Sequence, residues 1–286
     1  MKKLVVIRGG GELATGIAHR LHNSGYRVLM LEKESPSAIR RSIVFAEAVY
    51  DGTKIVERVE CYLAKNVKEA EPLLKDGKVI IMVDPECKCL EELKPKVLVD
   101  AIYAKRNMGT TMDMAPLTIG IGPGFAAGRD VHAVIETSRG HNLGRIIRSG
   151  QAMPEKEAAD ARAIMRSSHP IIAPFDGTLV RGHALGLIVK EGEPIVTLMS
   201  EDDENRKMVI TSPMEGVLRG LLHDGCPVKA GLKIAEIDPS TRPDNCYTIS
   251  AKSRCVSGSV LEEIMAWEKV NTKKKSRFSF LSRGDE

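Results

Sequence analysis

The sequence predicts an α/β fold: a Rossmann-like, doubly wound and mostly parallel sheet, followed by a small all-β barrel-sandwich domain of the biotinyl/lipoyl-like type. Three observations lead to this prediction. Over the first 150 residues, apolar strand-like runs alternate with helical segments, as in parallel sheets that are covered by helices on both faces. A glycine-rich turn follows the first of these runs. Residues 170–198 and 209–237 form a weak internal repeat of proline, glycine and alternating apolar residues, which is typical of short antiparallel strands.

The same patterns divide the chain into segments. We expect a Rossmann-like domain over residues 1–150, a helical connector, and a barrel-sandwich-like domain over residues 165–240. Residues 241–270 should form a C-terminal segment with a short amphipathic helix around Val260–Trp267. Residues 271–286 are rich in lysine and arginine, and we expect this tail to be disordered.

The first residues read as a β-α-β unit. Residues 4–7 are a branched apolar run, residues 13–21 have helical spacing, and residues 27–31 form a second apolar run. The turn between the first strand and the helix is Gly9-x-Gly11-x-x-Ala14, which fits the alanine-ending dinucleotide fingerprint.

This turn predicts a nucleotide site. Gly9 and Gly11 would let the helix N-terminus approach a pyrophosphate, and Glu32 lies about 20 residues further on, where a carboxylate can accept from ribose hydroxyls. Arg40 and Arg41 follow the second strand, and one of them could meet a 2′-phosphate, so the choice between NAD and NADP stays open. Against this reading, Glu12 places a negative charge in the first helical turn.

The remaining part of the first domain continues the alternation of strands and helices. Residues 55–64, 78–84 and 96–104 read as strands, and residues 66–77 and 89–95 as helices. The polar loop that follows the last of these strands contains Lys105 and Asn107. Since ligands of α/β proteins bind beyond the carboxyl ends of the strands, both residues are candidate ligand contacts.

Residues 117–151 carry the densest set of charged residues on a glycine-rich frame. Two apolar runs lie on either side of Gly122-Pro123-Gly124, whose glycines permit bare peptide N–H groups to approach a ligand. Arg139 and Arg145 could hold a phosphate or carboxylate through their guanidinium groups. The candidates for proton transfer are Asp130, Glu136 and His141. The alternative is an ordinary hairpin with solvated charges.

Composition excludes several classes of function. Aromatic residues make up 4% of the chain and the net charge is +4, which argues against a base-stacking nucleic-acid surface. No apolar run is long enough for a membrane span or a secretory signal, so we expect a cytoplasmic protein with reduced cysteines. The close pair Cys87 and Cys89 is too little for a metal site, and we expect none. The oligomeric state stays open.

With these segments in view, the chain resembles the YqeB family, accessory proteins of the selenium-dependent molybdenum hydroxylase system. The resemblance extends over nearly the whole chain. It rests on residues 5–21, 36–52, 97–111, 115–147, 216–239 and 260–264. The most specific segment is GPGF…DVHAVIET.RGH within residues 115–147.

The resemblance implies a Rossmann-like first part, a barrel-like second part and a role in maturing a molybdenum hydroxylase, which would be the partner. The two polar clusters at the sheet edge would then hold a phosphate-bearing ligand, either a nucleotide or the molybdenum cofactor. The resemblance carries no catalytic mechanism over to individual residues. Two alternatives remain open. One is an NAD(P)-dependent oxidoreductase with Lys105 or His132 as proton donor, and the other is a non-catalytic scaffold whose glycine turns are structural.

Overall fold

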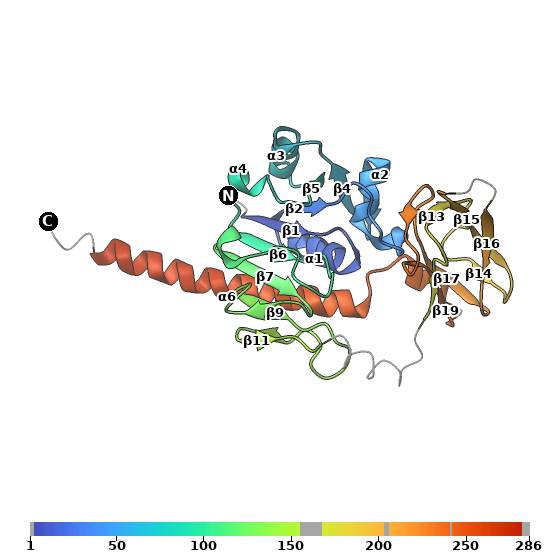
Figure 1. The fold of residues 1–286 in the computed structure, drawn as a ribbon. Helices are drawn as coiled ribbons and strands as arrows, with labels where there is room; N and C mark the ends of the chain where they lie inside the picture. The colour runs from blue at the N-terminus through green and yellow to red at the C-terminus, as the bar shows by residue number, and fades with distance from the viewer. Residues whose placement is uncertain (1–2, 155–167, 203–205, 241, 282–286) are drawn as a thin grey trace.

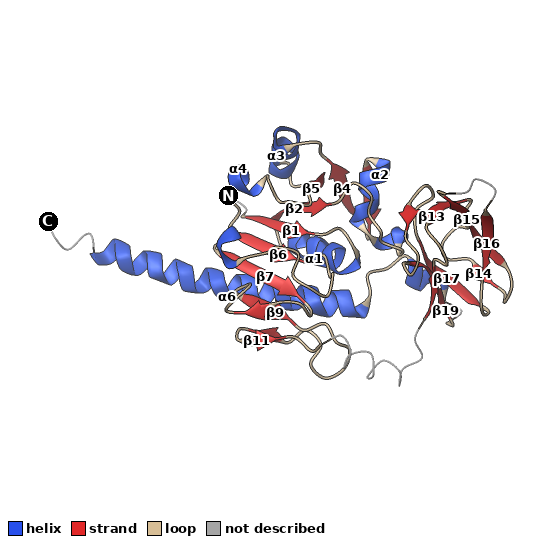
Figure 2. Ribbon diagram, in the orientation of Figure 1, coloured by secondary structure: helices blue, strands red, loops and turns tan. Residues whose placement is uncertain are grey.

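The computed structural model describes residues 3–154, 168–202, 206–240 and 242–281, the last nine of these as backbone only. One large sheet with its helices forms the first part of the structure, and a compact set of antiparallel strands, here called the β-module (β12–β19), forms the second (Figure 1). The β-module lies beyond one end of the large sheet (Figure 2). The predicted helical connector lies mostly outside the described residues.

The large sheet has nine strands in the order β10-β9-β7-β6-β1-β2-β5-β4-β3. The seven strands from β9 to β4 pair in parallel, whereas β3 and β10 are antiparallel edge strands. Their bounds are β1 Leu4–Arg8, β2 Arg27–Glu32, β3 Thr53–Val56, β4 Val59–Leu63, β5 Val79–Val83, β6 Val97–Asp100, β7 Leu117–Ile121, β9 Ala133–Ile135 and β10 Ile146–Ile147. The short pair β8 Ala126–Ala127 and β11 Gly150–Gln151 lies outside this sheet.

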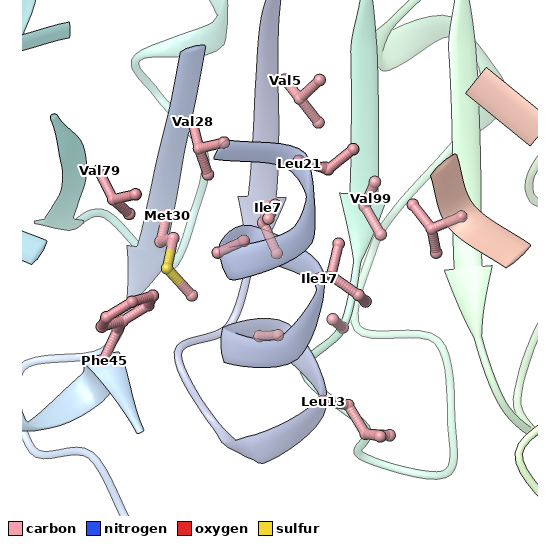
Figure 3. Close-up of a cluster of buried hydrophobic side chains, with 14 of the residues drawn as sticks. Val5, Ile7, Leu13, Ile17, Leu21, Val28, Met30, Phe45, Val79 and Val99 are labelled. Carbon is pink, nitrogen blue, oxygen red and sulfur yellow. The ribbon is translucent and has the colours of Figure 1, made fainter. Parts of the chain in front are cut away.

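Each face of the sheet buries one set of alternating apolar side chains. Val5 and Ile7 of β1 face a core shared with α1 (Glu12–Asn23) and α6 (Ala251–Leu281), part of which is drawn in Figure 3. Leu4 and Val6 face a second core with α3 (Val67–Lys75) and α4 (Leu90–Leu93). The remaining helix, α2, is Ala48–Asp51. Because both faces are covered, the central strands are continuous apolar runs.

The β-module consists of two four-stranded antiparallel sheets that share one apolar core. Their orders are β12-β19-β17-β14 and β16-β15-β13-β18. The bounds are β12 His169–Ile172, β13 Gly177–Val180, β14 Ile188–Val189, β15 Pro194–Ser200, β16 Lys207–Thr211, β17 Gly216–Leu221, β18 Pro227–Val228 and β19 Lys233–Asp238.

The prediction of a Rossmann-like doubly wound sheet plus a biotinyl/lipoyl-like barrel-sandwich domain is wrong. The large sheet is mixed, with antiparallel strands at both edges, and the β6–β7 connection contains only a 3-10 turn at Met112–Met114. Helix α6, from the far end of the chain, covers the face at β7 and β9 instead. Alternating apolar residues predict where strands occur, but they do not predict how the strands are ordered or which sheet each one joins. The sequence pattern was therefore not enough to assign either of the two named folds.

Helix α6 is longer than the short helix that we predicted. It begins at Ala251 and continues to Leu281, into the segment expected to be disordered, while residues 282–286 lie outside the described residues. Buried Val256, Val260 and Ile264 attach it to the large sheet. No helix of the described ranges is long and apolar enough to span a membrane.

The chain from the end of β2 through α2 joins the large sheet to the β-module. Leu221 of β17 donates its N–H to the carbonyl of Ile39 (2.7 Å), and the Nε of Arg41 donates to the carbonyl of Leu221 (2.8 Å). The ring of Tyr50 stacks on His223 with centroids 4.3 Å apart. Backbone pairing and ring stacking therefore fix the β-module against the sheet.

The packing of α1 on α6 predicts opposite effects for two glycine-to-alanine changes. A Cβ at Gly16 would lie 2.8 Å from the Cβ of Ser253, whereas a Cβ at Gly258 meets nothing within 4 Å. We expect Gly16→Ala to lower the free energy of unfolding by about 1–3 kcal/mol through overpacking. Gly258→Ala should raise it by about 0.5–1 kcal/mol through helix propensity. Urea denaturation checks both, and a stabilising Gly16→Ala would contradict the close approach.

An ion-pair network in the β-module predicts an acid-sensitive stability. Glu236 is buried and forms ion pairs with Arg219 and Lys233. Burial opposes ionisation, but Arg219 and then Lys233 outweigh it and lower the pKa of Glu236 to about 2 from its usual 4.5. A lowered carboxyl pKa stabilises the fold above the unfolded-state value, and this contribution is lost as the pH falls from about 4.5 to 2.

We therefore expect the wild-type chain to lose up to about 3 kcal/mol more stability than Glu236→Gln between those pH values. Urea denaturation at a series of pH values measures the difference. Glu215→Gln is the matched control at a carboxylate outside this network. Parallel acid profiles for wild type and Glu236→Gln would contradict the assignment.

Candidate functional site

A buried ion pair lies at the carboxyl ends of the two central strands. Arg8 ends β1 and Asp100 ends β6, and the two residues are in register. The Nη1 of Arg8 lies 3.2 Å from Asp100 and 2.5 Å from the hydroxyl of Thr110, which itself donates to Asp100 at 2.6 Å. The Nη2 of Arg8 donates to the carbonyls of Pro85 and Met108. This cluster holds together both ends of the loop of residues 101–109.

That loop, which contains the predicted contacts Lys105 and Asn107, is strained. Tyr103 has a φ of 61° and Lys105 a φ of 63°, a left-handed conformation that costs free energy for residues other than glycine. The side-chain amide of Asn107 bonds to the backbone of Gly109 and Thr110. Asn107 therefore shapes the loop itself. Such strain persists where surrounding contacts over-determine the backbone, and it is concentrated at functional sites.

Tyr103 meets two other segments at this edge of the sheet. Its hydroxyl accepts from the Nζ of Lys252 in the first turn of α6, at 3.2 Å, and lies 3.5 Å from the hydroxyl of Thr137 after β9. The Lys252 ammonium is also 4.9 Å from the centre of the Tyr103 ring. We call Tyr103, Lys105, Thr137, Arg139 and Lys252 the edge cluster. Tyr103, Thr137 and Lys252 come from three distant segments and are in contact, and Lys105 and Arg139 lie on the same loops as Tyr103 and Thr137.

Gly122 and Gly124 were predicted to expose peptide N–H groups to a ligand, but their close neighbours are other parts of the chain. Both have positive φ values, of 81° and 107°. A Cβ at Gly122 would lie 2.7 Å from the Thr137 hydroxyl, and one at Gly124 would lie 2.6 Å from the Arg106 backbone. Gly122 therefore makes room for the edge cluster, and Gly124 makes room for the loop of residues 101–109.

The glycine turn after β1 is similarly occupied by protein. A Cβ at Gly9 would lie 3.0 Å from the backbone of Ala101 and Ile102. The N–H of Gly10 donates to the Glu32 carboxylate at 2.7 Å, so the predicted ribose acceptor bonds to the turn itself. Burial raises the pKa of Glu32. Gly11 is the exception, since a Cβ there would meet nothing within 4 Å.

Glu12 places a carboxylate in the first turn of α1, where a phosphate would otherwise bind. Its carboxylate lies 2.9 Å from the Nη1 of Arg40, so that arginine is already paired rather than open to a 2′-phosphate. Burial opposes ionisation of Glu12, but Arg40 and a hydrogen bond from Ser250 lower its pKa overall. A phosphate placed at the N-terminus of α1 would therefore meet a carboxylate.

Two of the three predicted proton-transfer residues, Asp130 and Glu136, lie at opposite ends of β9. Glu136 is buried and accepts three backbone N–H bonds at 2.7 Å, from Thr137, Ser138 and Met153, so it anchors the backbone around it. Asp130 precedes β9, at the opposite end of that strand from Glu136. It bonds to Ala126 and Arg129, and a hydrogen bond from Arg129 lowers its pKa. His132 also precedes β9, and burial lowers its pKa.

The loop after β9 carries the remaining predicted residues. Arg139, His141 and Arg145 are exposed on it. The exposed thiol of Cys255, on α6, lies 3.4 Å from the carbonyl of Leu143 in the same loop. No group of three or more His, Cys, Asp or Glu residues suited to a metal ion occurs within the described residues.

Sequence reasoning missed Tyr103, Thr137, Lys252 and Cys255. Tyr103 and Thr137 each follow a strand, a position that could have singled them out. The helical spacing of Lys252 and Cys255 places both on one side of α6. No local pattern predicts that this helix ends up beside the loops at the carboxyl edge.

Comparison with known proteins gives one clear relative. No family model matches the chain. The chain is 45% identical over 264 residues to a protein of Escherichia coli K12 that is described as the uncharacterized protein YqeB. The match covers 92% of this chain but only 47% of YqeB, so the chain spans about half the length of this relative.

Likeness to solved structures is weak. A succinylglutamate desuccinylase/aspartoacylase from Shewanella frigidimarina is 14% identical over 52% of this chain and 54% of its own, with a TM-score of 0.23. The ectoine utilization protein EutE from Ruegeria pomeroyi is 10% identical over 84% of this chain and 86% of its own, with a TM-score of 0.28. At these TM-scores the likeness assigns no activity.

The buried pair at the strand ends predicts a strong effect of removing one partner. Arg8→Met leaves Asp100, which is 1% exposed, as an uncompensated buried carboxylate. We expect a loss of about 3–5 kcal/mol in the free energy of unfolding, measured by urea denaturation.

A matched control is Lys78→Met, which removes the partner of Glu60 in a half-exposed pair. Pairs of that kind contribute little, so this variant should unfold like the wild type. Equal losses in Arg8→Met and Lys78→Met would contradict the structural role given to Arg8.

Proposed function

Taking membership of the YqeB family, which the 45% identity supports, as the premise, we propose that the edge cluster binds a phosphate-bearing small molecule. We further propose that this binding serves the maturation of a selenium-dependent molybdenum hydroxylase. The hydroxylase role comes from the family resemblance, and the binding role from the geometry of the cluster.

One observation supports the binding role most strongly. The Lys252 ammonium lies 3.2 Å from the hydroxyl of Tyr103. Tyr103 belongs to a loop in which both it and Lys105 have left-handed backbone conformations. The protein maintains this strained loop through the buried Arg8–Asp100–Thr110 cluster. The loop brings Lys105 to the same edge as Arg139 and Lys252, and cations and hydroxyls together recognise phosphate.

The proposed ligand is a mononucleotide-like or pterin-type cofactor with its phosphate at the edge cluster. A dinucleotide held by the glycine turn fits the geometry less well, because Glu32 already accepts the Gly10 N–H and Glu12 lies in the first turn of α1. For the same reason we do not favour the NAD(P)-dependent oxidoreductase. Within the proposal, Lys252 and Arg139 neutralise the phosphate, and Tyr103 and Thr137 orient it by hydrogen bonds.

A non-catalytic scaffold is the second candidate. It is favoured because backbone N–H groups at the carboxyl edge already donate to the protein's own side chains, such as the three that donate to Glu136, and so need no ligand. A scaffold would bring the hydroxylase and its maturation machinery together without a small ligand. Ligand binding at the edge cluster distinguishes the two candidates.

Titration calorimetry with inorganic phosphate, AMP and NAD tests the binding proposal. We expect AMP to bind, NAD to bind no more tightly than AMP, and Lys252→Ala and Arg139→Ala each to weaken AMP binding by about tenfold, or 1.4 kcal/mol. Lys96→Ala is the matched control, because Lys96 is exposed at the amino end of β6. If no probe binds, or if all three variants behave alike, the edge cluster is not an anion site.

Hydroxylase activity in cells of the native host tests the maturation role separately. Cells that lack this protein should lose activity of a selenium-dependent molybdenum hydroxylase, and Lys96→Ala should restore it whereas Lys252→Ala should not. Full restoration by Lys252→Ala, with AMP binding lost in vitro, would leave the scaffold as the function. Activity that persists without the protein would contradict a maturation role.

A further inference from the structure

The turn between β3 and β4 consists of residues that do not suit its shape. Val56 of β3 pairs with Val59 of β4, so only Glu57 and Arg58 lie between the two strands. Both have positive φ values, of 43° and 70°, as the two-residue turns of twisted hairpins require. Asparagine and glycine adopt this conformation at the lowest cost. A glutamate and an arginine are strained here, and such strain points to a role for one of the side chains.

The side chain of Glu57 makes contacts with a distant part of the chain, whereas Arg58 is exposed. The Oε1 of Glu57 accepts the backbone N–H of Ile249 at 2.8 Å and an N–H of the Arg254 guanidinium at 2.6 Å. The Nε2 of His19 lies 4.0 Å from its Oε2. Burial opposes ionisation of Glu57, but the bonds from Ile249 and Arg254 outweigh it and lower its pKa. Glu57 is therefore a charged carboxylate bound to the start of α6.

The two main partners of Glu57 lie on either side of Lys252. Ile249 precedes α6, and Arg254 belongs to its first turn. One carboxylate therefore fixes the chain three residues before Lys252 and two residues after it. Lys252 is the residue of this turn whose ammonium reaches the hydroxyl of Tyr103, at 3.2 Å. The place of that ammonium in the edge cluster thus depends on a side chain of the β3–β4 turn.

We propose that Glu57 is a positioning residue for the edge cluster, and that it holds the first turn of α6 so that Lys252 meets the phosphate of the ligand beside Tyr103. The effect on affinity rests on the proposed binding function, but the effect on α6 is present without any ligand. The strain at Glu57 then serves the precision of the site rather than the stability of the hairpin. Binding sites depend on such supporting contacts to hold their side chains in place.

Hydrogen exchange of the ligand-free protein tests the effect on α6. Asparagine tolerates the left-handed conformation, but it is shorter than glutamate, so Glu57→Asn relaxes the turn and removes the contacts with α6. We expect amides of residues 249–255 to exchange at least about tenfold faster in this variant. Arg58→Asn is the matched control, because it relaxes the same turn and keeps Glu57, and it should not change that exchange. Equal exchange in the wild type and Glu57→Asn would overturn the proposal.

Titration calorimetry with AMP tests the effect on the site. Glu57→Asn should weaken AMP binding by about tenfold, and the double variant with Lys252→Ala should bind no more weakly than Lys252→Ala alone. Glu57→Gln keeps an acceptor of the same length and should stay within about threefold of the wild type. Arg58→Asn should bind like the wild type.

The remaining outcomes separate this proposal from the proposed function. A lower melting temperature of Glu57→Asn with unchanged AMP affinity would make Glu57 merely structural and would overturn the proposal. Additive losses in the double variant would also overturn it, since Glu57 would then not act through Lys252. If the wild type binds no AMP, the proposed function fails, and the exchange comparison alone decides whether Glu57 positions α6.

Discussion

The interaction on which the candidate site depends is the buried contact of Arg8 with Asp100 and Thr110. It joins the ends of β1 and β6 and gives the guanidinium further acceptors on the chains around Pro85 and Met108. A buried cation is tolerated only when it is paired and hydrogen-bonded, so its partners have little freedom to move. The loop of residues 101–109 takes its shape from this requirement. Tyr103 and Lys105 keep an unfavourable backbone conformation because both ends of their loop are fixed.

At the carboxyl edge of the sheet, acidic side chains of the protein accept hydrogen bonds from backbone N–H groups that could otherwise bind a ligand. Glu32 accepts from the glycine turn, and Glu136 accepts from the two residues after it and from Met153. Sequence motifs show where such N–H groups will be available. They do not show whether the chain fills the position itself, because that depends on which side chains arrive from other strands.

The sequence predicted local elements better than their assembly. The apolar runs at residues 4–7, 27–31 and 78–84 lie in strands β1, β2 and β5, because a buried parallel strand needs a continuous apolar run. The strand order, the antiparallel edges and the docking of α6 follow from long-range packing, which the period of apolar residues does not encode. Lys252 illustrates the limit: it looks like an exposed lysine before a helix, and only the packing of α6 on α1 brings it to Tyr103.

Helix α6 connects the two ends of the large sheet. Its first turn carries Lys252 of the edge cluster, and four turns later Glu268 forms an ion pair with Lys3, just before β1, at 2.8 Å. An α-helix is stiff along its axis, with a rise of about 1.5 Å per residue. Displacement of Lys252 along that axis would therefore also displace Glu268 relative to Lys3. Helix α6 therefore couples the Tyr103–Lys252 contact to the Lys3–Glu268 ion pair, so that a shift of the helix at one contact changes the distance at the other.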